Sequence, residues 1–344
     1  MVIATGKRSS GFSLVELMIG MLLGILLMTG AASIYLGSKR SFIEVEQVAS
    51  LSDNGRFALK LMTDSLRHVG FTGQVLGNTI VSDPLLTDPP NDCTGQAAAY
   101  NLNRLLFAIN AGTSGSVFNC ITDPMDNTDV LVIKHVVAAP LSDADPDDPN
   151  APRDNTISFP NPNELASVIE DSKTYIMTNN AIGIIFDGVD TPPTITTGGD
   201  VPGGTAWEYL FEIYYVRDTG GVPQLARKFL SWDGVQMVVD TENIIPGVED
   251  MRLQFGVDND NDGDVDRYTN VAGVTNWSRV SSVEAFLLVR NAAEDKQYID
   301  TKTYNLGNDV AITPNDPNEV HYRRTVMNTR VSLRNMKLVI RGGG

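Results

Sequence analysis

The feature that most restricts the possible folds is an unbroken apolar run near the N-terminus, residues 12–36. As a helix this run would be about 37 Å long, which is enough to cross the hydrocarbon core of a bilayer. A buried core helix is a weaker explanation, because the run is long and has no polar face. A cleaved signal peptide is a stronger one, since Lys7 and Arg8 precede the run and residues 30–33 offer a small-residue cleavage site.

The only charged residue in this run is Glu16. A carboxylate within a membrane-spanning helix costs on the order of 3 kcal/mol at mid-bilayer and less near the edge. A positive charge from a neighbouring helix would remove that cost and would draw the two helices together. The alternative is a carboxylate that lies in the headgroup layer and has no partner.

The segment KRSSGFSLVELMIGMLLGILL resembles the class III signal of type IV prepilins, in which a basic leader and a glycine precede F-[ST]-L-x-E. The resemblance implies that a prepilin peptidase removes residues 1–11 by cutting after Gly11, and that Phe12 is then methylated on its amine. Residues 12–36 would stay as a single-pass inner-membrane anchor with a cytoplasmic N-terminus. Glu16 would pair with the terminal amine of an adjacent subunit and so act in assembly.

Residues 37–70 change to an amphipathic pattern, which predicts the second half of the same long helix. One face at 3.6-residue spacing collects the apolar positions Leu51, Ala58, Met62, Leu66 and Val69. The stretch NGRFALKLMTDSLRHVGFTG resembles a signature of PilW-type minor pilins. Gln74 stands where members of that family often have cysteine.

From residue 71 onwards, short β-rich runs alternate with turn residues. The predicted strands are Val130–Ala138, Tyr175–Thr178, Ile182–Asp187, Glu208–Arg217, Gln224–Trp232, Arg252–Val257, Val280–Arg290 and Thr325–Val339. Residues 218–221 predict a hairpin turn. The expected class is α+β, with antiparallel strands of a globular domain (71–344) packed on the helix's apolar stripe. That is also the pilin architecture, and GVEDMRLQFGVDNDNDGDVDRY, SSVEAFLLVRN and HYRRTVMNTRVSLRNMK resemble PilW-type sequences in the same order.

An acidic stretch, residues 258–266, has the spacing D-x-D-x-D-G-x-x-D of an EF-hand-type calcium loop, with Gly263 at the tight turn. Thr269 occupies the place of the usual bidentate glutamate, and an acid near Glu249 or Asp250 could replace it. We expect weak Ca²⁺ binding, with a Kd of about 10⁻⁴–10⁻³ M; the alternative is a solvated acidic hairpin tip. The expected metal-site residues are Asp258, Asp260, Asp262, Asp264 and Asp266.

Charge and cysteine content restrict function further. The net charge is −16; residues 1–40 have +3 and residues 321–344 have +6, which leaves −25 for residues 41–320. Such an acidic surface argues against nucleic-acid binding, which needs Lys and Arg to neutralise phosphates. Cys93 and Cys120 are two buried thiols, or, if the domain is exported, one disulfide that stabilises it by about 3–4 kcal/mol.

No catalytic motif is found, and His68, His135 and His321 have no metal-ligand spacing, so an enzyme is not expected. The resemblance implies a minor pilin that assembles into a type IV pilus, in the tip complex that primes assembly, and that ends on the extracellular fibre. The implied partners are other minor pilins, the major pilin and a large tip adhesin. Two alternatives stay open: a minor pseudopilin of a type II secretion system tip, and a membrane-anchored calcium-binding surface receptor.

Overall fold

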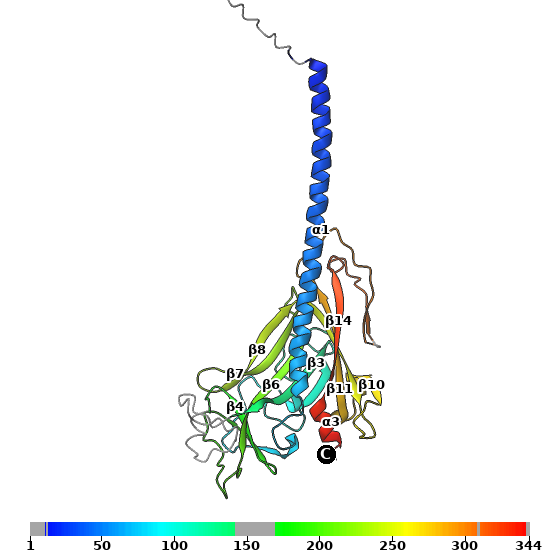
Figure 1. The fold of residues 1–344 in the computed structure, drawn as a ribbon. Helices are drawn as coiled ribbons and strands as arrows, with labels where there is room; N and C mark the ends of the chain where they lie inside the picture. Colours follow the sequence, from blue (N-terminus) through cyan, green and yellow to red (C-terminus); the bar gives the residue numbers. More distant parts are fainter. Residues whose placement is uncertain (1–10, 12, 142–168, 308–309, 342–344) are drawn as a thin grey trace, which may run out of the picture. The chain divides into compact units, whose positions relative to one another are not determined.

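The computed structural model describes residue 11 and residues 13–141, 169–307 and 310–341 (Figure 1). Contacts divide the chain into two compact units, Met1–Ser50 and Leu51–Gly344. The helices are α1 (Leu14–His68) and α3 (Arg334–Arg341), with short 3-10 helices η1 (Gly77–Thr79), η2 (Gly95–Ala97), η3 (Val271–Gly273) and η4 (Trp277–Arg279). The strands are β1 (Ile80–Ser82), β2 (Leu106–Asn110), β3 (Asp129–Pro140), β4 (Thr174–Thr178), β5 (Gly183–Asp187), β6 (Thr205–Arg217), β7 (Gln224–Trp232), β8 (Met237–Pro246), β9 (Val248–Val257), β10 (Arg267–Asn270), β11 (Val280–Arg290), β12 (Tyr304–Leu306), β13 (Val310–Ile312) and β14 (Arg324–Ser332).

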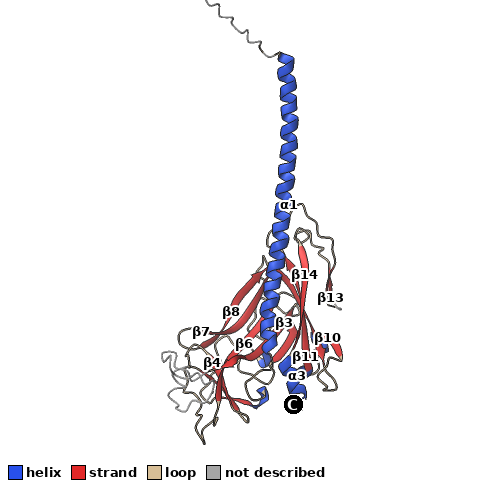
Figure 2. Ribbon diagram, in the orientation of Figure 1, coloured by secondary structure: helices blue, strands red, loops and turns tan. Residues whose placement is uncertain are grey.

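In the second unit, the last part of α1 lies against the strands (Figure 2). The five residues of the predicted apolar stripe, from Leu51 to Val69, are all buried and belong to one core cluster. Gly55 allows β14 to approach closely, because a Cβ atom at this position would overlap the sulfur of Met327. The predicted α+β class, a long N-terminal helix packed on a mainly antiparallel sheet domain, is confirmed.

The larger sheet has eight strands in the order β1-β5-β4-β6-β3-β2, and β7 and β8 extend it from β6. Only the β1–β5 pair is parallel among the described strand pairs. Because side chains alternate along a strand, β3 buries Leu131 and Ile133 beneath the helix and Val130 and Val132 on the opposite face. This two-sided burial explains why the central strands are almost continuously apolar.

The smaller sheet has the order β10-β9-β11-β14. One face, with Leu253, Phe255 and Leu287, joins the core beneath the helix. The other face is partly polar, and there Arg330 donates to Glu284 across the β11–β14 pair at 2.6 Å. The two sheets thus share one apolar layer with the helix.

The C-terminus differs from its prediction. The strand expected up to Val339 ends at Ser332, and α3 follows it beside the end of α1. The side-chain amide of Asn335 donates to the carbonyl oxygens of Arg67, His68 and Val69 at 3.3–3.5 Å, and so caps α1.

A disulfide joins Cys93 to Cys120, 27 positions apart in the sequence. The segment inside this bridge is also held by Lys134, a fully buried residue of β3. Its ammonium group donates to the carbonyls of Gln96, Ala98 and Asn101 at 2.6–3.0 Å. Desolvation of this ammonium lowers the pKa of Lys134 to about 7.

Candidate functional site

Two segments carry the functional residues expected from the sequence. At the N-terminus, Gly11 is exposed and helix α1 begins at Leu14; Phe12 lies outside the described residues. The carboxylate of Glu16 accepts a hydrogen bond from the backbone nitrogen of Ser13 at 3.1 Å. This Ser-x-x-Glu pair has the spacing of a capping box, which the sequence analysis did not recognise. Glu16 therefore satisfies one free donor of the helix end in the single chain.

The apolar half of α1 is exposed along its whole length in the first unit. Every described side chain from Ser13 to Ile43 is exposed, and the helix is long and apolar enough to span a membrane. The hydroxyl of Thr29 donates to the carbonyls of Ile25 and Leu26, both at 2.9 Å, so its polar group is satisfied within the helix. A surface of this kind fits a lipid environment or contact with other apolar helices.

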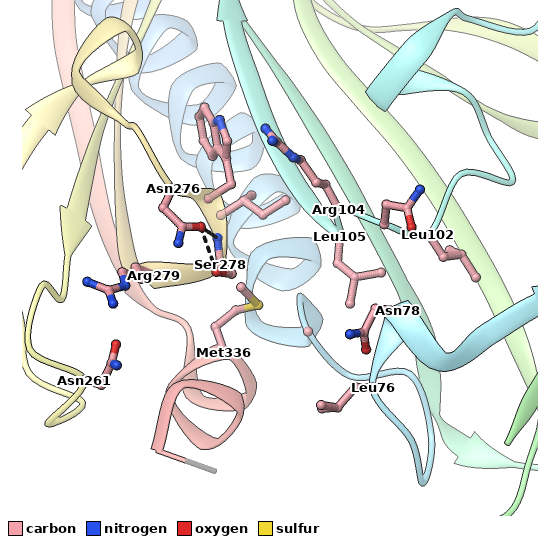
Figure 3. Close-up of a pocket in the computed structure, with 14 residues that line it drawn as sticks. Leu76, Asn78, Leu102, Arg104, Leu105, Asn261, Asn276, Ser278, Arg279 and Met336 are labelled. Atoms are coloured by element: carbon pink, nitrogen blue, oxygen red, sulfur yellow. Dashed lines mark hydrogen bonds between the residues drawn. The ribbon is translucent and has the colours of Figure 1, made fainter. Parts of the chain in front are cut away.

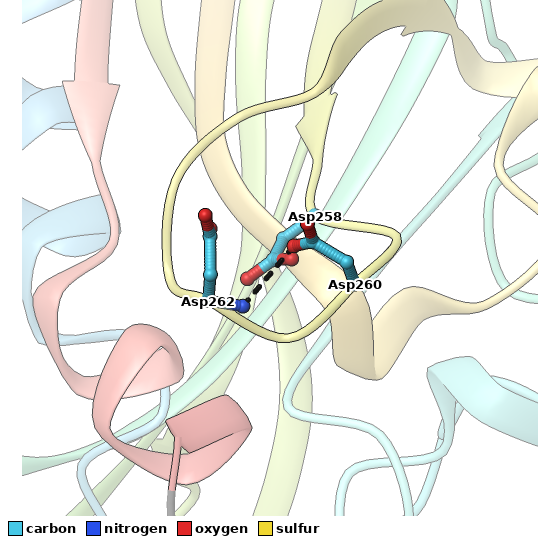
Figure 4. Close-up of side chains that lie close together, drawn as sticks. All are labelled: Asp258, Asp260 and Asp262. Atoms are coloured by element: carbon cyan, nitrogen blue, oxygen red, sulfur yellow. Dashed lines mark hydrogen bonds between the residues drawn. The ribbon is translucent and has the colours of Figure 1, made fainter.

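The second segment is the acidic loop between β9 and β10. The structure brings together Asp258, Asp260 and Asp262, which each offer a carboxylate oxygen within 4.8 Å of the others (Figure 4). Asp258 is fully buried, whereas the other two are exposed. Three acids this close repel one another, and a bound cation would relieve that repulsion.

Backbone hydrogen bonds hold this loop in a tight turn. The Asp258 carboxylate accepts from the nitrogens of Asn261 and Gly263, both at 2.7 Å. Gly263 has a φ of 88°, a conformation that favours glycine, as expected for the sixth position of the motif. The Asp266 carboxylate closes the loop by accepting from the nitrogen of Asn259 at 2.6 Å. The first carboxylate is thus fixed in place before any ligand arrives.

The remaining expected ligands do not join the three-acid group. The carboxylate of Asp264 is not part of this group, and its backbone nitrogen donates to the carboxylate of Asp262 at 2.7 Å. Thr269 lies within β10 and pairs with Phe255, so position 12 is part of the sheet. The loop thus fits a divalent cation with three carboxylates, one backbone carbonyl and water as ligands.

The suggestion that Glu249 or Asp250 completes the site is wrong. Both residues lie at the start of β9, whereas the acidic loop follows its end. Glu249 accepts from Arg324 at 2.6 and 2.9 Å, and Asp250 from Arg252 at 2.8 and 2.9 Å. Burial raises the pKa of Asp250 to about 6 despite the neighbouring Arg252.

One polar cluster was missed from the sequence. The rings of His68 and His135 stack with centroids 5.4 Å apart, although 67 positions separate them in the chain. His135 Nε2 lies 3.7 Å from Glu212, whose carboxylate also accepts from Arg227 at 2.6 Å. Alternation along β3 and β6 could have indicated this, since His135 and Glu212 interrupt apolar strands. The cluster thus connects the end of α1 with β3, β6 and β7.

Comparisons with known proteins agree with these two segments. Residues 213–335 match the family described as type IV pilus-assembly protein W, PilW, and residues 6–32 match the prokaryotic N-terminal methylation motif. A solved type IV-like pilin from Thermus thermophilus is 12% identical, with a TM-score of 0.21 over 50% of this chain and 92% of its own. No curated protein matches the sequence.

A prepilin methylation motif at the start of an exposed apolar helix, followed by an α+β domain, defines a type IV pilin-like protein. Within that class, residues 213–335 match the PilW family. The pilin class implies processing by a prepilin peptidase and contact with other pilus components. The anchor suits the inner membrane before assembly.

Proposed function

We propose that this protein is a minor pilin of the tip complex that primes assembly of a type IV pilus, and that its role is structural. The observation that carries the proposal is the exposed apolar half of α1, which has a single acid at its start and follows a prepilin motif. The PilW match supports the tip assignment. The partners would be other minor pilins, the major pilin and a large tip adhesin.

During assembly, Glu16 would exchange its hydrogen bond with Ser13 for an ion pair with an adjacent subunit. In the single chain this carboxylate accepts one hydrogen bond, from the uncharged backbone nitrogen of Ser13. The methylated amine of Phe12 in an adjacent subunit would supply a full positive charge in an apolar environment, where an ion pair is much stronger than in water. Cleavage after Gly11 creates that amine, so processing and docking become sequential steps.

The test compares Glu16→Leu with Glu46→Leu in cells that make pili. Glu46 lies on the same helix and is exposed, so it is a matched control. We expect the Glu16 variant to reach sheared surface fibres at one-tenth of the normal level or less, since it loses an interaction of a few kcal/mol. Normal membrane levels of both variants exclude a defect in expression. Equal incorporation of the two variants would contradict the proposal.

We also propose that the acidic loop binds Ca²⁺. Asp258, Asp260 and Asp262 would supply carboxylate oxygens, and Asp264 would supply its carbonyl. Asp266 would act through its hydrogen bond to Asn259, or through water. With only three carboxylates in contact, the affinity belongs in the weak range typical of extracellular modules.

A further inference from the structure

A cavity of about 430 Å³ lies in the second unit, close to the acidic loop. Its wall is formed by the loop after α1, the segment before β2, the turn at η4 and the start of α3 (Figure 3). This volume is within the range of sites that hold small organic ligands. The residues used below are Leu76, Leu105, Met336, Arg104, Asn276 and Arg279.

The polar part of the wall includes two arginines, whose guanidinium groups only donate, and several asparagines. Arg104 is exposed, and among the described residues its guanidinium makes only a cation–π contact, 5.7 Å from the centre of the Phe107 ring. The oxygen of the Asn276 side chain accepts twice from Ser278, at 2.7 and 3.1 Å, which leaves the amide NH₂ to donate elsewhere. Arg279 supplies a second guanidinium, and no carboxylate pairs with it within the described part of the chain.

The charge of the wall contrasts with that of the surrounding chain. Residues 41–320 have a net charge of −25, yet the lining residues that the structure describes include two arginines and no acid. The wall also has asparagine side chains and an apolar part, with Leu76, Leu105 and Met336 on view in Figure 3. Guanidinium and amide donors beside an apolar wall match a carboxylate carried on an apolar body.

We infer that this cavity binds an organic anion whose carboxylate contacts Arg104 and whose apolar part packs on the leucine and methionine side chains. A small acid and the free C-terminus of a peptide share this chemistry. The site is separate from α1's apolar half, so its ligand would be bound in addition to the pilus contacts proposed above.

Arg279 also connects the cavity to the acidic loop. Its guanidinium donates to the carbonyl of Asn259 at 2.6 Å, and its own carbonyl accepts from the nitrogen of Asp258 at 3.0 Å. Asn261 of the same loop lines the cavity. If the loop binds Ca²⁺ as proposed, the ion would neutralise acids next to the cavity, and each ligand would strengthen binding of the other.

The test is calorimetric titration of the full chain in nonionic detergent with N-acetyl-leucine and with its uncharged amide. We expect the acid to bind at least tenfold more tightly than the amide, because hydrogen bonds to a charged carboxylate are stronger than those to a neutral amide. Arg104→Gln should weaken binding of the acid about tenfold, and the matched control Arg56→Gln, on the exposed face of α1, should leave it unchanged. Equal binding of acid and amide, no binding of either, or an Arg104→Gln variant that binds normally would overturn the inference.

Two further titrations identify the source of the ligand and test the role of calcium. Tighter binding of acetyl-Ala-Ala-Leu than of N-acetyl-leucine supports a peptide C-terminus, and equal binding supports a small acid. Ca²⁺ should tighten binding of N-acetyl-leucine several-fold, and Arg104→Gln should leave Ca²⁺ binding unchanged. Arg104-dependent binding of the acid without any Ca²⁺ binding would contradict the calcium proposal alone and support the cavity.

Discussion

At the scale of single residues, several buried charged groups of the second unit have partners in place. Arg324 is buried and donates to Glu249 and to the carbonyl of Glu319, at 2.6–2.9 Å. Glu212 is buried with Arg227, and Lys134 with three carbonyls. Loss of one partner would leave the other group buried and unsatisfied, which is more costly than loss of a surface ion pair.

Glu212 gives a pH-dependent prediction. Burial alone would raise its pKa, but hydrogen bonding with His135 and Ser65 and the charge of Arg227 outweigh burial and lower the pKa to about 2. We assign the main part to Arg227, which donates at 2.6 Å, because the nearest His135 nitrogen is 3.7 Å away. Since the folded pKa lies below the unfolded value, Glu212 stabilises the fold above about pH 4.5, and that contribution is lost as the pH falls towards 2.

The free energy of unfolding of the full chain in detergent, measured between pH 6 and 3, tests this. The difference in the free energy of unfolding between wild type and Glu212→Gln should decrease by about 2 kcal/mol as the pH falls through this window. Glu242→Gln is the matched control, because Glu242 binds the same arginine at 2.7 Å from an exposed position. A difference between wild type and Glu212→Gln that does not change with pH would show that Glu212 titrates normally.

At the scale of elements, hydrophobic periodicity correctly predicted strands whose bounds are set by the burial of apolar side chains. The strands Gln224–Trp232 and Val280–Arg290 have the predicted bounds, because apolar residues and turn signals coincide there. The C-terminal strand was predicted too long, since the arginines that alternate with apolar residues up to Ser332 continue at helical spacing in α3. The short edge strand β1 carries no local pattern, because its pairing partner β5 is distant in sequence.

The junction of α1 and α3 should be sensitive to substitution at Gly70. Gly70 has a φ of 83°, and a Cβ atom there would lie 2.8 Å from the Met336 sulfur and 3.1 Å from its backbone nitrogen. We expect Gly70→Ala to lower the free energy of unfolding by about 1–3 kcal/mol. Gly221→Ala is the control, because nothing lies within 4 Å of its added Cβ, and it should change stability little. If thermal unfolding shows the same change in stability for both variants, the close contact between Gly70 and Met336 does not contribute to stability as predicted.

The acidic loop is the element where the sequence predicted the residues but not the whole ligand set. The spacing indicated Asp258, Asp260 and Asp262, which lie close together in the structure. A ligand to replace the glutamate missing at Thr269 could not be found from the sequence, because Glu249 and Asp250 lie at the far end of β9 from the loop. Ca²⁺ at ten times its Kd should stabilise the full chain by about 1.4 kcal/mol. Asp260→Asn should remove most of this effect, whereas Asp264→Asn should retain it, because residue 264 would bind through its carbonyl. A wild-type melting temperature that Ca²⁺ leaves unchanged would contradict the site.

At the scale of the whole molecule, the two units have different surfaces and different tasks. The first unit presents an apolar helix that is long enough to cross a membrane, which its length and composition predicted. The methylation motif at its start was also recognisable from the sequence. The second unit is a closed α+β domain whose strong negative charge favours solubility outside the membrane. The capping contact of Glu16 had a local signal in the Ser-x-x-Glu spacing, whereas the stacking of His68 on His135 could not be predicted, because it depends on how the fold brings α1 and β3 together.

The most direct test of the central claim is the intact mass and N-terminal sequence of this protein recovered from sheared surface fibres. The account predicts a chain that begins at Phe12 and carries one additional methyl group on its amine. A fibre-associated chain that retains residues 1–11, or one cleaved near Ala32 so that the apolar helix is lost, would contradict it.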